Sequence, residues 1–204
     1  MSLTSMSRPL LLAVVLTLPL PSVAAAQHDG GGAPRAASTA PREATQFAFL
    51  LGQWELTVTP KVTTLAARIH GAPKLRGSWK AWRAFDGFGI EDELRIVDRS
   101  GNPSALNHAM RVYDAAQGRW SQSMLDVYRA RLTSATAEWK GSEMIVHSQG
   151  SDAEGKPTLQ RGRFFAITPT SFSYQNDRSS DNGKSWETEV LRIEARRVAA
   201  VAPR

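Results

Sequence analysis

The sequence predicts an all-β protein, an antiparallel up-and-down barrel of about eight to ten strands that follows a short helical turn. Three observations favour this fold class. Apolar and polar residues alternate with period two through most of the chain from Trp54 onward. Clusters of Gly, Asn, Asp and Pro, which favour turns, recur roughly every 8–12 residues. After Leu51 the sequence lacks the longer apolar period of an amphipathic helix.

The N-terminal segment is typical of an export signal. Arg8 is the only charged side chain before the apolar run 10–20, and small residues then lead to a cleavage point before Gln27. The run is shorter than the ~20 apolar residues of a membrane-spanning helix, and Pro19 interrupts it. We therefore predict a signal peptide at 1–26, an exported protein that is periplasmic or secreted, and no membrane span after cleavage.

The rest of the chain predicts one folded domain. Residues 27–45 form a Gly/Ala/Pro-rich linker, 46–197 the β-barrel domain and 198–204 a short tail. The chain has no cysteine. Disulfides therefore cannot stabilise the fold, although an exported protein could carry them, and burial of apolar side chains has to suffice.

Charge argues against nucleic acid as a partner. The chain has 25 basic and 19 acidic residues, a net charge of +6. The basic residues are dispersed, whereas a nucleic-acid-binding surface requires them to be concentrated. The sequence leaves the oligomeric state open.

The individual elements follow from alternation and turn residues. A helical turn is expected at 43–51, and the first strand at 54–59 places Trp54 and Leu56 on one face. The sequence signal at 61–73 is weak, and either a strand or a loop could lie there. Consecutive hairpins favour a meander over a Greek key, and closing the meander removes exposed strand edges. Further strands are expected at 76–85, 90–97, 106–113, 119–128, 135–139, 143–148, 158–167, 171–176 and 186–197.

The last hairpin carries a recognisable turn sequence, the pattern Ser179-x-Asp181-x-Gly183-x-Ser185-Trp186. It matches the Asp-box of sialidase propeller blades, but a propeller needs several copies. Asp181 can accept backbone hydrogen bonds within the turn, and Gly183 can adopt a positive φ. We interpret Asp181, Gly183 and Trp186 as a structural turn, in preference to a carbohydrate contact.

Three motifs resemble those of a bacterial family of secreted or cytoplasmic domains with a lipocalin-like (calycin-type) β-barrel and no assigned function. They are Phe49-Leu50-Leu51-Gly52-Gln53-Trp54, then Arg111-Val112-Tyr113-Asp114 with Gly118-Arg119-Trp120, and Asp181-Asn182-Gly183-Lys184-Ser185-Trp186-Glu187.

The resemblance extends over 47–192, with departures at two turns. Ala115 and Asn182 stand where the family often has Pro and Gly. The resemblance implies a lipocalin-like barrel with a central cavity, and it supplies no catalytic residues.

The sequence offers little that could perform chemistry. Alternation along a strand directs Asp92 away from its neighbours Glu91 and Glu93, so these three carboxylates cannot chelate one ion. His108 is the one candidate for a haem ligand, but a lone histidine among apolar residues is more often part of the core. Motifs for nucleophilic catalysis are absent. We expect no catalytic residues, no metal and no cofactor. The histidines are widely separated, at His28, His70, His108 and His147.

Asp92 nevertheless stands out, because it shares a strand face with apolar residues. A buried carboxylate needs a partner, which Arg111 or Arg163 could supply. Three alternatives remain: a ligand contact, a purely structural ion pair, or an exposed face. The candidate ligand-binding residues are Trp82, Asp92, Arg111, Trp120, Arg163 and Tyr174.

We favour a non-catalytic barrel that binds a small apolar or amphipathic ligand in its cavity. One alternative is an envelope interaction module with a filled core that works through its outer face. The other is an enzyme of unknown reaction, which would require at least two titratable groups, such as Asp92 and His108, to converge in one pocket.

Overall fold

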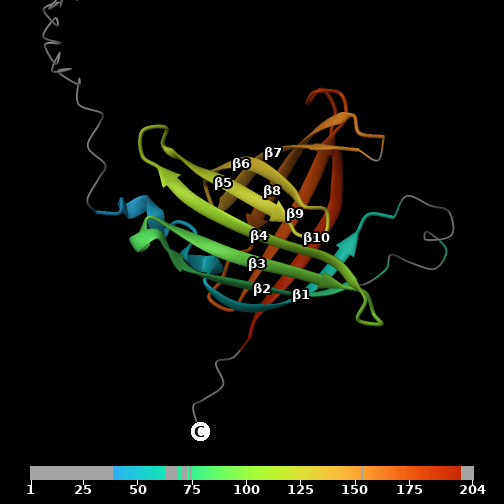
Figure 1. Cartoon of the computed structure of the whole chain (residues 1–204), viewed down its shortest axis with the longest axis horizontal. Helices are drawn as coiled ribbons and strands as arrows, with labels where there is room; N and C mark the ends of the chain where they lie inside the picture. Colours follow the sequence, from blue (N-terminus) through green and yellow to red (C-terminus); the bar gives the residue numbers. More distant parts are fainter. Residues whose placement is uncertain (1–38, 63–68, 70–72, 74, 153, 199–204) are drawn as a thin grey trace, which may run out of the picture. The chain divides into compact units, whose positions relative to one another are not determined.

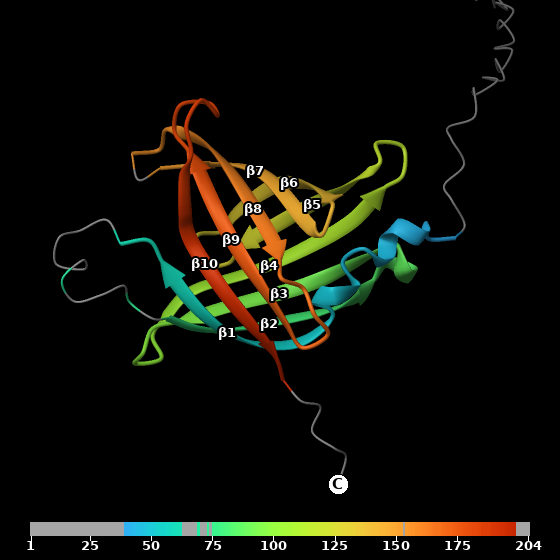
Figure 2. The ribbon, with the colours of Figure 1, turned by 180° about the vertical axis from the view of Figure 1, so that it is seen from behind.

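The computed structural model describes residues 39–62, 69, 73, 75–152 and 154–198. Within them, ten antiparallel strands form one closed barrel (Figures 1 and 2). Each strand pairs with its neighbours in sequence, and β1 closes the ring against β10. The predicted all-β, up-and-down, lipocalin-like barrel is therefore confirmed. The predicted signal peptide, most of the linker and most of the tail lie outside the described residues.

The strands begin and end close to the predicted turns. Their bounds are β1 Gly52–Pro60, β2 Leu75–Ala84, β3 Gly89–Val97, β4 Pro103–Asp114, β5 Arg119–Asp126, β6 Arg131–Lys140, β7 Glu143–Ser151, β8 Pro157–Phe165, β9 Ser171–Ser179 and β10 Glu187–Arg197.

Short 3₁₀ turns precede β1 and connect β2 to β3. They are η1 (Arg42–Thr45), η2 (Ala48–Leu50) and η3 (Phe85–Gly87). Across the part of the chain that the structure describes, we find no helix that is both long and apolar enough to pass through a membrane.

The period-two alternation of β1 places its apolar residues inside the barrel. Trp54, Leu56 and Val58 are buried, whereas the intervening residues are exposed. Trp54 pairs with Trp79 on β2, and Val58 pairs with Ile193 on β10. These side chains belong to one apolar core shared by both neighbouring strands.

One end of the barrel is closed by the residues of η1 and η2. In a meander, the turns after β2, β4, β6 and β8 share this end, which we call the plugged end; the other turns mark the far end. Phe47 and Leu50 are fully buried there. The Phe47 ring meets the Trp120 ring edge-on, at a centroid distance of 4.8 Å. We call Phe47, Phe49 and Leu50 the plug.

Arg197, at the end of β10, fastens the plug to the barrel. Its Nη1 donates to the carbonyl of Leu51 at 2.7 Å, and its Nε donates to the carbonyl of Pro169 at 2.6 Å. The guanidinium also lies 4.1 Å from the centre of the Trp54 ring. A single charged side chain thus connects η2, the β8–β9 turn and β1.

Several strands are longer in the structure than in the sequence analysis, and β6 and β7 are the most informative of them. The predicted limits, 135–139 and 143–148, agree with the part over which β6 and β7 pair, since pairing begins at Ala135 and Ser148. β6 in fact starts at Arg131 and β7 ends at Ser151. The additional residues pair with β5 and β8 respectively, which alternation within a single segment does not reveal.

Candidate functional site

The barrel encloses a cavity of about 250 Å³, which we call the chamber. Every strand from β2 to β10 contributes to its lining. Apolar walls come from residues such as Leu94, Ala109, Val146, Phe164, Leu191 and Ile193. Polar groups come from Asp92, Asn107, Arg111, Gln122, Tyr174 and Asn176.

An ion pair lies in the chamber wall. Arg111 Nε donates to Asp92 Oδ2 at 2.6 Å, and Nη2 donates to Oδ1 at 3.1 Å. The two side chains are only 7% and 3% exposed. Because the bond is bidentate and both partners are charged, it holds the two strands β3 and β4 in a fixed relation. The pair is neutral as a whole, which makes its burial tolerable.

Trp79 and Gln122 extend this pair into a network. Trp79 Nε1 donates to Asp92 Oδ1 at 2.7 Å, and Arg111 Nη1 donates to Gln122 Oε1 at 2.7 Å. The guanidinium of Arg111 also lies 5.1 Å from the centre of the Phe47 ring. The network therefore forms a polar floor between the plug and the chamber.

The Gln122 amide leaves one strong donor unused. Its Nε2 is buried and has no hydrogen-bond partner among the residues that the structure describes. The amide cannot simply turn over, because its oxygen already accepts from Arg111. A buried donor without a partner costs about 1–3 kcal/mol. Gln122 is itself one of the residues that line the chamber.

Tyr174 adds a second polar group to the chamber wall. Burial raises the pKa of Tyr174 to about 12, against the opposing effect of the nearby Arg111 charge. The phenol is therefore protonated at neutral pH and can donate a hydrogen bond. Gly162 on β8 makes room for it, because a Cβ there would lie 2.5 Å from the Tyr174 hydroxyl oxygen.

The structure brings Asp92, Arg111 and Tyr174 together, as the sequence analysis expected for a cavity. All three line the chamber. Arg111, and not Arg163, is the partner of Asp92.

Neither Arg163 nor Trp82 lines the chamber, which differs from the expectation of the sequence analysis. Arg163 points outward from β8, where it pairs with Glu143 and lies 5.2 Å from the Phe165 ring centre. Trp82 is exposed on β2, and its Nε1 donates to Glu91 at 3.0 Å. Alternation groups residues correctly onto faces, but it does not say which face is inside.

Trp120 also lies outside the chamber lining. It is fully buried in the core at the plugged end, against Phe47. Its Nε1 donates to Gln46 Oε1 at 3.0 Å, so it fixes the segment between η1 and η2. Trp120 therefore packs against the plug instead of forming the expected aromatic wall of the chamber.

Sequence reasoning missed two residues of the polar floor, Trp79 and Gln122. A signal for each existed. Trp79 lies on the opposite face of β2 from Trp82. Assigning that opposite face to the barrel interior would have identified Trp79. Gln122 lies on the same face of β5 as Trp120 and Met124, and it is the polar residue between these two apolar ones.

The structure separates the two residues that were named for the enzyme alternative, Asp92 and His108. Asp92 is buried and faces the chamber, while Glu93 pairs with His108 on the outer face. The His108 ring lies 5.9 Å from the exposed Trp82 ring. Asp92 and His108 therefore do not meet in one pocket. Among the described residues, His, Asp and Glu form no group of three that could hold a metal ion.

The turn between β9 and β10 has the local bonds expected of the Asp-box sequence. Asp181 Oδ2 accepts from Ser185 Oγ at 2.6 Å, and its Oδ1 accepts from the Ser185 backbone N–H at 2.9 Å. The Gly183 N–H donates to Ser179 Oγ at 2.8 Å, and Gly183 has a φ of 88°. Trp186 follows, with the Arg161 guanidinium 4.5 Å from its ring centre.

We expect this turn to contribute stability that disappears in acid. The Ser185 hydroxyl, the Ser185 backbone N–H and the Ser179 hydroxyl lower the pKa of Asp181 from 3.8 to about 2. Because the pKa is lower in the folded state, the contribution is complete above the unfolded-state value and is lost as pH falls through about 2. Urea unfolding of wild type and Asp181→Asn should show a difference that shrinks below about pH 4.

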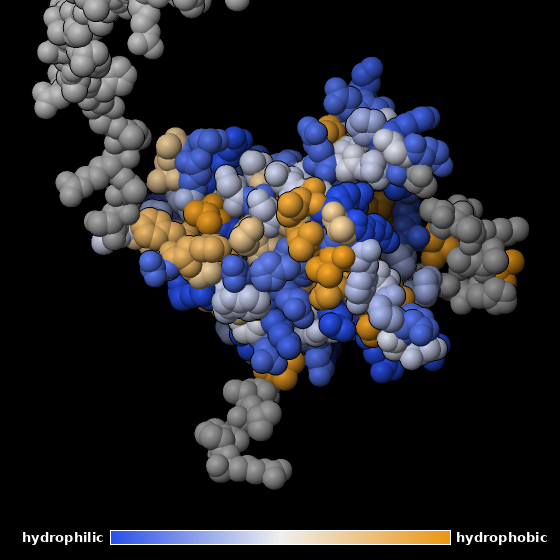
Figure 3. Space-filling view, in the orientation of Figure 1, coloured by the Kyte–Doolittle hydropathy of each residue, from blue (hydrophilic) through white to orange (hydrophobic). Residues whose placement is uncertain are grey.

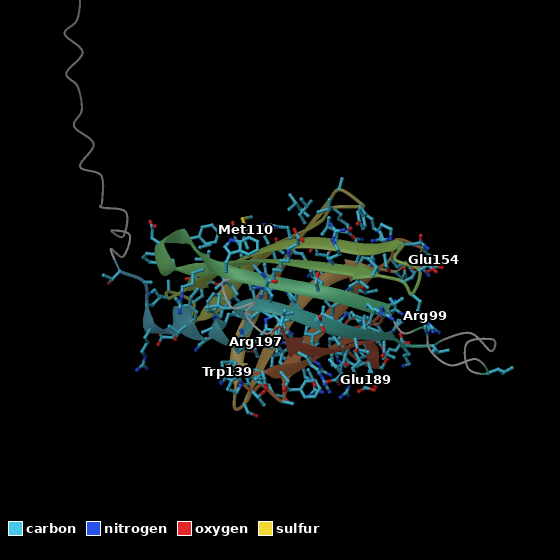
Figure 4. All side chains as sticks on the ribbon, turned by 90° about the horizontal axis from the view of Figure 1, so that it is seen from below. Arg99, Met110, Trp139, Glu154, Glu189 and Arg197 are labelled. Atoms are coloured by element: carbon cyan, nitrogen blue, oxygen red, sulfur yellow. The ribbon has the colours of Figure 1, made fainter. Side chains whose placement is uncertain are left out.

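Glu154→Gln is the control for this measurement. Glu154 lies in an exposed turn (Figure 4). Its substitution should leave the free energy of unfolding and its pH dependence nearly unchanged. A pH-independent effect of Asp181→Asn would contradict the assigned role of the carboxylate.

Fold and site together define the class of protein, a closed ten-strand antiparallel barrel of lipocalin-like type with a partly polar chamber. No protein-family model matches the chain, and no curated protein matches it either. A solved structure similar to the chain is the S-type phycobiliprotein lyase CPES from Guillardia theta. The two share 11% identity over 76% of this chain and 92% of that chain, with a TM-score of 0.49.

Proposed function

We propose that the chain is an exported, non-catalytic barrel that binds a small, partly apolar ligand in its chamber. The observation that carries this proposal is the buried, unpartnered Nε2 of Gln122 in the wall of a chamber within the barrel. A core that served stability alone would be filled, or would pair this donor. Binding of an acceptor supplies the missing partner.

The polar floor indicates which end of the ligand is innermost. Gln122 Nε2 and the protonated Tyr174 hydroxyl are donors, while Asp92 and Arg111 neutralise each other. The inner end of the ligand therefore carries a hydrogen-bond acceptor, such as a carbonyl or carboxylate oxygen. Leu94, Val146 and other apolar wall residues favour a hydrocarbon or aromatic body next to it.

A variant that fills the chamber tests the proposal. Ala109 is buried and lines the chamber, so Ala109→Phe occupies ligand space. We expect the affinity for the fluorescent probe 11-(dansylamino)undecanoic acid to fall about tenfold or more, which corresponds to about 1.4 kcal/mol of binding free energy. Fluorescence titration measures the affinity, and thermal melting verifies that the variant folds.

The neighbouring residue provides a matched control. Met110 is exposed, and its side chain points away from the barrel interior (Figure 4). Met110→Phe adds an aromatic ring to the outer face and should leave probe affinity unchanged. Equal affinities for both variants and wild type would overturn the proposal, as would a wild type that binds no probe and carries no co-purified mass in native mass spectrometry.

Export and family membership form part of the same proposal. The predicted signal peptide at 1–26 supports a periplasmic or secreted barrel, with 27–45 as linker and 46–197 as the folded domain. The three motifs described above support membership of the bacterial lipocalin-like family that the sequence resembles. Mass spectrometry of the mature N-terminus tests the cleavage before Gln27.

One observation favours a second candidate, the envelope interaction module. Apolar side chains are exposed on the outer face of four strands, and Figure 3 shows apolar residues on the side that carries β4 and β5. Because Ala109→Phe changes only the interior, it would leave such an interaction intact while abolishing ligand binding. The exposed outer-face residues are Trp82, Met110, Val112, Leu125 and Leu132.

A further inference from the structure

The wall of the barrel is open between β6 and β7 near the far end. Pairing between these strands stops at Ala135 and Ser148. Beyond that point, and within the described residues, 131–134 of β6 pair only with β5, and 149–151 of β7 pair only with β8. Each strand therefore continues along its other neighbour while the two separate from each other.

A second cavity, of about 640 Å³, lies over this opening; we call it the cleft. Consecutive residues 132–136 of β6 and 147–149 of β7 line it. Successive residues of a strand point to opposite faces of a sheet. Because residues of both faces contribute to it, this depression lies along the unpaired edges of β6 and β7 and not over one face of the sheet.

The cleft and the chamber share part of their lining. Thr133, Ala135, Ser148 and Gln160 line both. Met124, which pairs with Thr133 and lines the chamber, is 38% exposed although it points inward.

The volumes of the two cavities indicate how one ligand could occupy both of them. Pockets for drug-sized ligands measure roughly 300–1,000 Å³. The chamber, at about 250 Å³, lies below that range and accommodates only part of such a molecule. The cleft is larger than the chamber and begins where the chamber ends. A ligand whose acceptor end reaches Gln122 therefore has room to continue outward.

We infer that the ligand is an elongated amphiphile, with its acceptor end on the polar floor and its apolar tail leaving through the gap between β6 and β7. This inference rests on the proposed function. The tail lies in the cleft against Leu132, which is 71% exposed, and against Leu159 and Trp186. The Arg161 guanidinium, 4.5 Å from the Trp186 ring centre, holds that ring at the cleft.

Chain length tests the inference. The probes are straight-chain alkanoic acids and 2-alkanones, which share an oxygen acceptor at or beside one end and differ in charge. For wild type, we expect affinity to rise by up to about fourfold per added methylene, and to keep rising after the chain has filled the chamber. Isothermal titration calorimetry measures each affinity.

A cross-link across the gap supplies the decisive variant. Because the chain has no cysteine, Ser134→Cys with Gln149→Cys can be joined selectively by a bismaleimide. Both positions line the cleft on opposite sides of the gap. The control joins Gln53→Cys to Lys80→Cys, an exposed pair on β1 and β2. Ser134→Trp closes the cleft without a cross-link, and thermal melting verifies that each variant folds.

The outcomes separate the two claims. With the gap closed, short probes should bind as in wild type, while the gain from longer chains is lost; the control should keep that gain. If the closed variants keep the full gain, the tail does not pass through the gap and the inference is wrong, while the proposed function stands. If neither probe series binds wild type, the proposed function fails, and the inference fails with it.

Discussion

Replacing Asp92 by alanine is expected to destabilise the barrel by about 3–5 kcal/mol, because the substitution leaves a buried guanidinium without its counter-ion. The Arg111 side chain is 7% exposed and cannot reach solvent without displacing its neighbours. Asp92 is also the acceptor for Trp79 Nε1. The free energy of unfolding, measured in urea, should fall accordingly, with an unchanged dependence on urea concentration.

Two comparisons distinguish loss of the ion pair from a general effect of substitution. Glu91→Ala, one residue earlier on the outer face, should change the free energy of unfolding by less than about 1 kcal/mol. The double variant Asp92→Leu with Arg111→Met should recover much of the lost stability, because it removes both buried charges. An Asp92→Ala protein as stable as Glu91→Ala would show that the pair contributes nothing.

Replacing Phe47 by alanine is expected to cost about 3–5 kcal/mol, because it opens a cavity at the plugged end. Phe47 is fully buried and makes edge-on contacts with Trp120 and Phe164, at centroid distances of 4.8 and 6.1 Å. These contacts add to the apolar area that is lost. Urea or thermal unfolding measures the effect.

Phe85→Ala is the matched control for the plug. Phe85 is an exposed phenylalanine near the plugged end, in η3. We expect its substitution to cost less than about 1 kcal/mol. If Phe47→Ala lowered the free energy of unfolding as little as Phe85→Ala, the plug would not stabilise the barrel.

The two substitutions act on opposite sides of the same floor. Arg111 stacks over the Phe47 ring on one side and bonds to Asp92 and Gln122 on the other. Loss of the Phe47 ring therefore also loosens the support of Arg111. Probe affinity should fall in Phe47→Ala even where the protein remains folded, because the Gln122 donor is no longer held in position.

Alternation and turn residues together were sufficient to predict the strands and their order. Each hairpin is local, and its turn residues occur beside the strands that they join, so the meander follows from short-range signals. The same alternation identified Asp92 as a carboxylate on an apolar face. The cost of burying an unpaired charge then required a partner, and Arg111 was one of the two expected.

Alternation could not determine which face of each strand points into the barrel. Trp79 and Trp82 alternate on one strand, and both are large and aromatic, so composition does not distinguish them. Trp79 is inside because its strand pairs with Trp54 on one side and Leu94 on the other, both of which contact the same core. Arg163 lies outside for the corresponding reason, since its neighbour Phe164 packs inward against Phe172.

By itself, the sequence determined the all-β class, a meander of about eight to ten strands and the presence of a charged residue within an apolar strand face. Only the tertiary structure decided which face is enclosed, that the oxygen of Gln122 is held by Arg111, and that β6 and β7 separate after Ala135 and Ser148. The physical reason is that alternation is a property of one strand, whereas enclosure and separation depend on how strands distant in sequence pack around a shared interior.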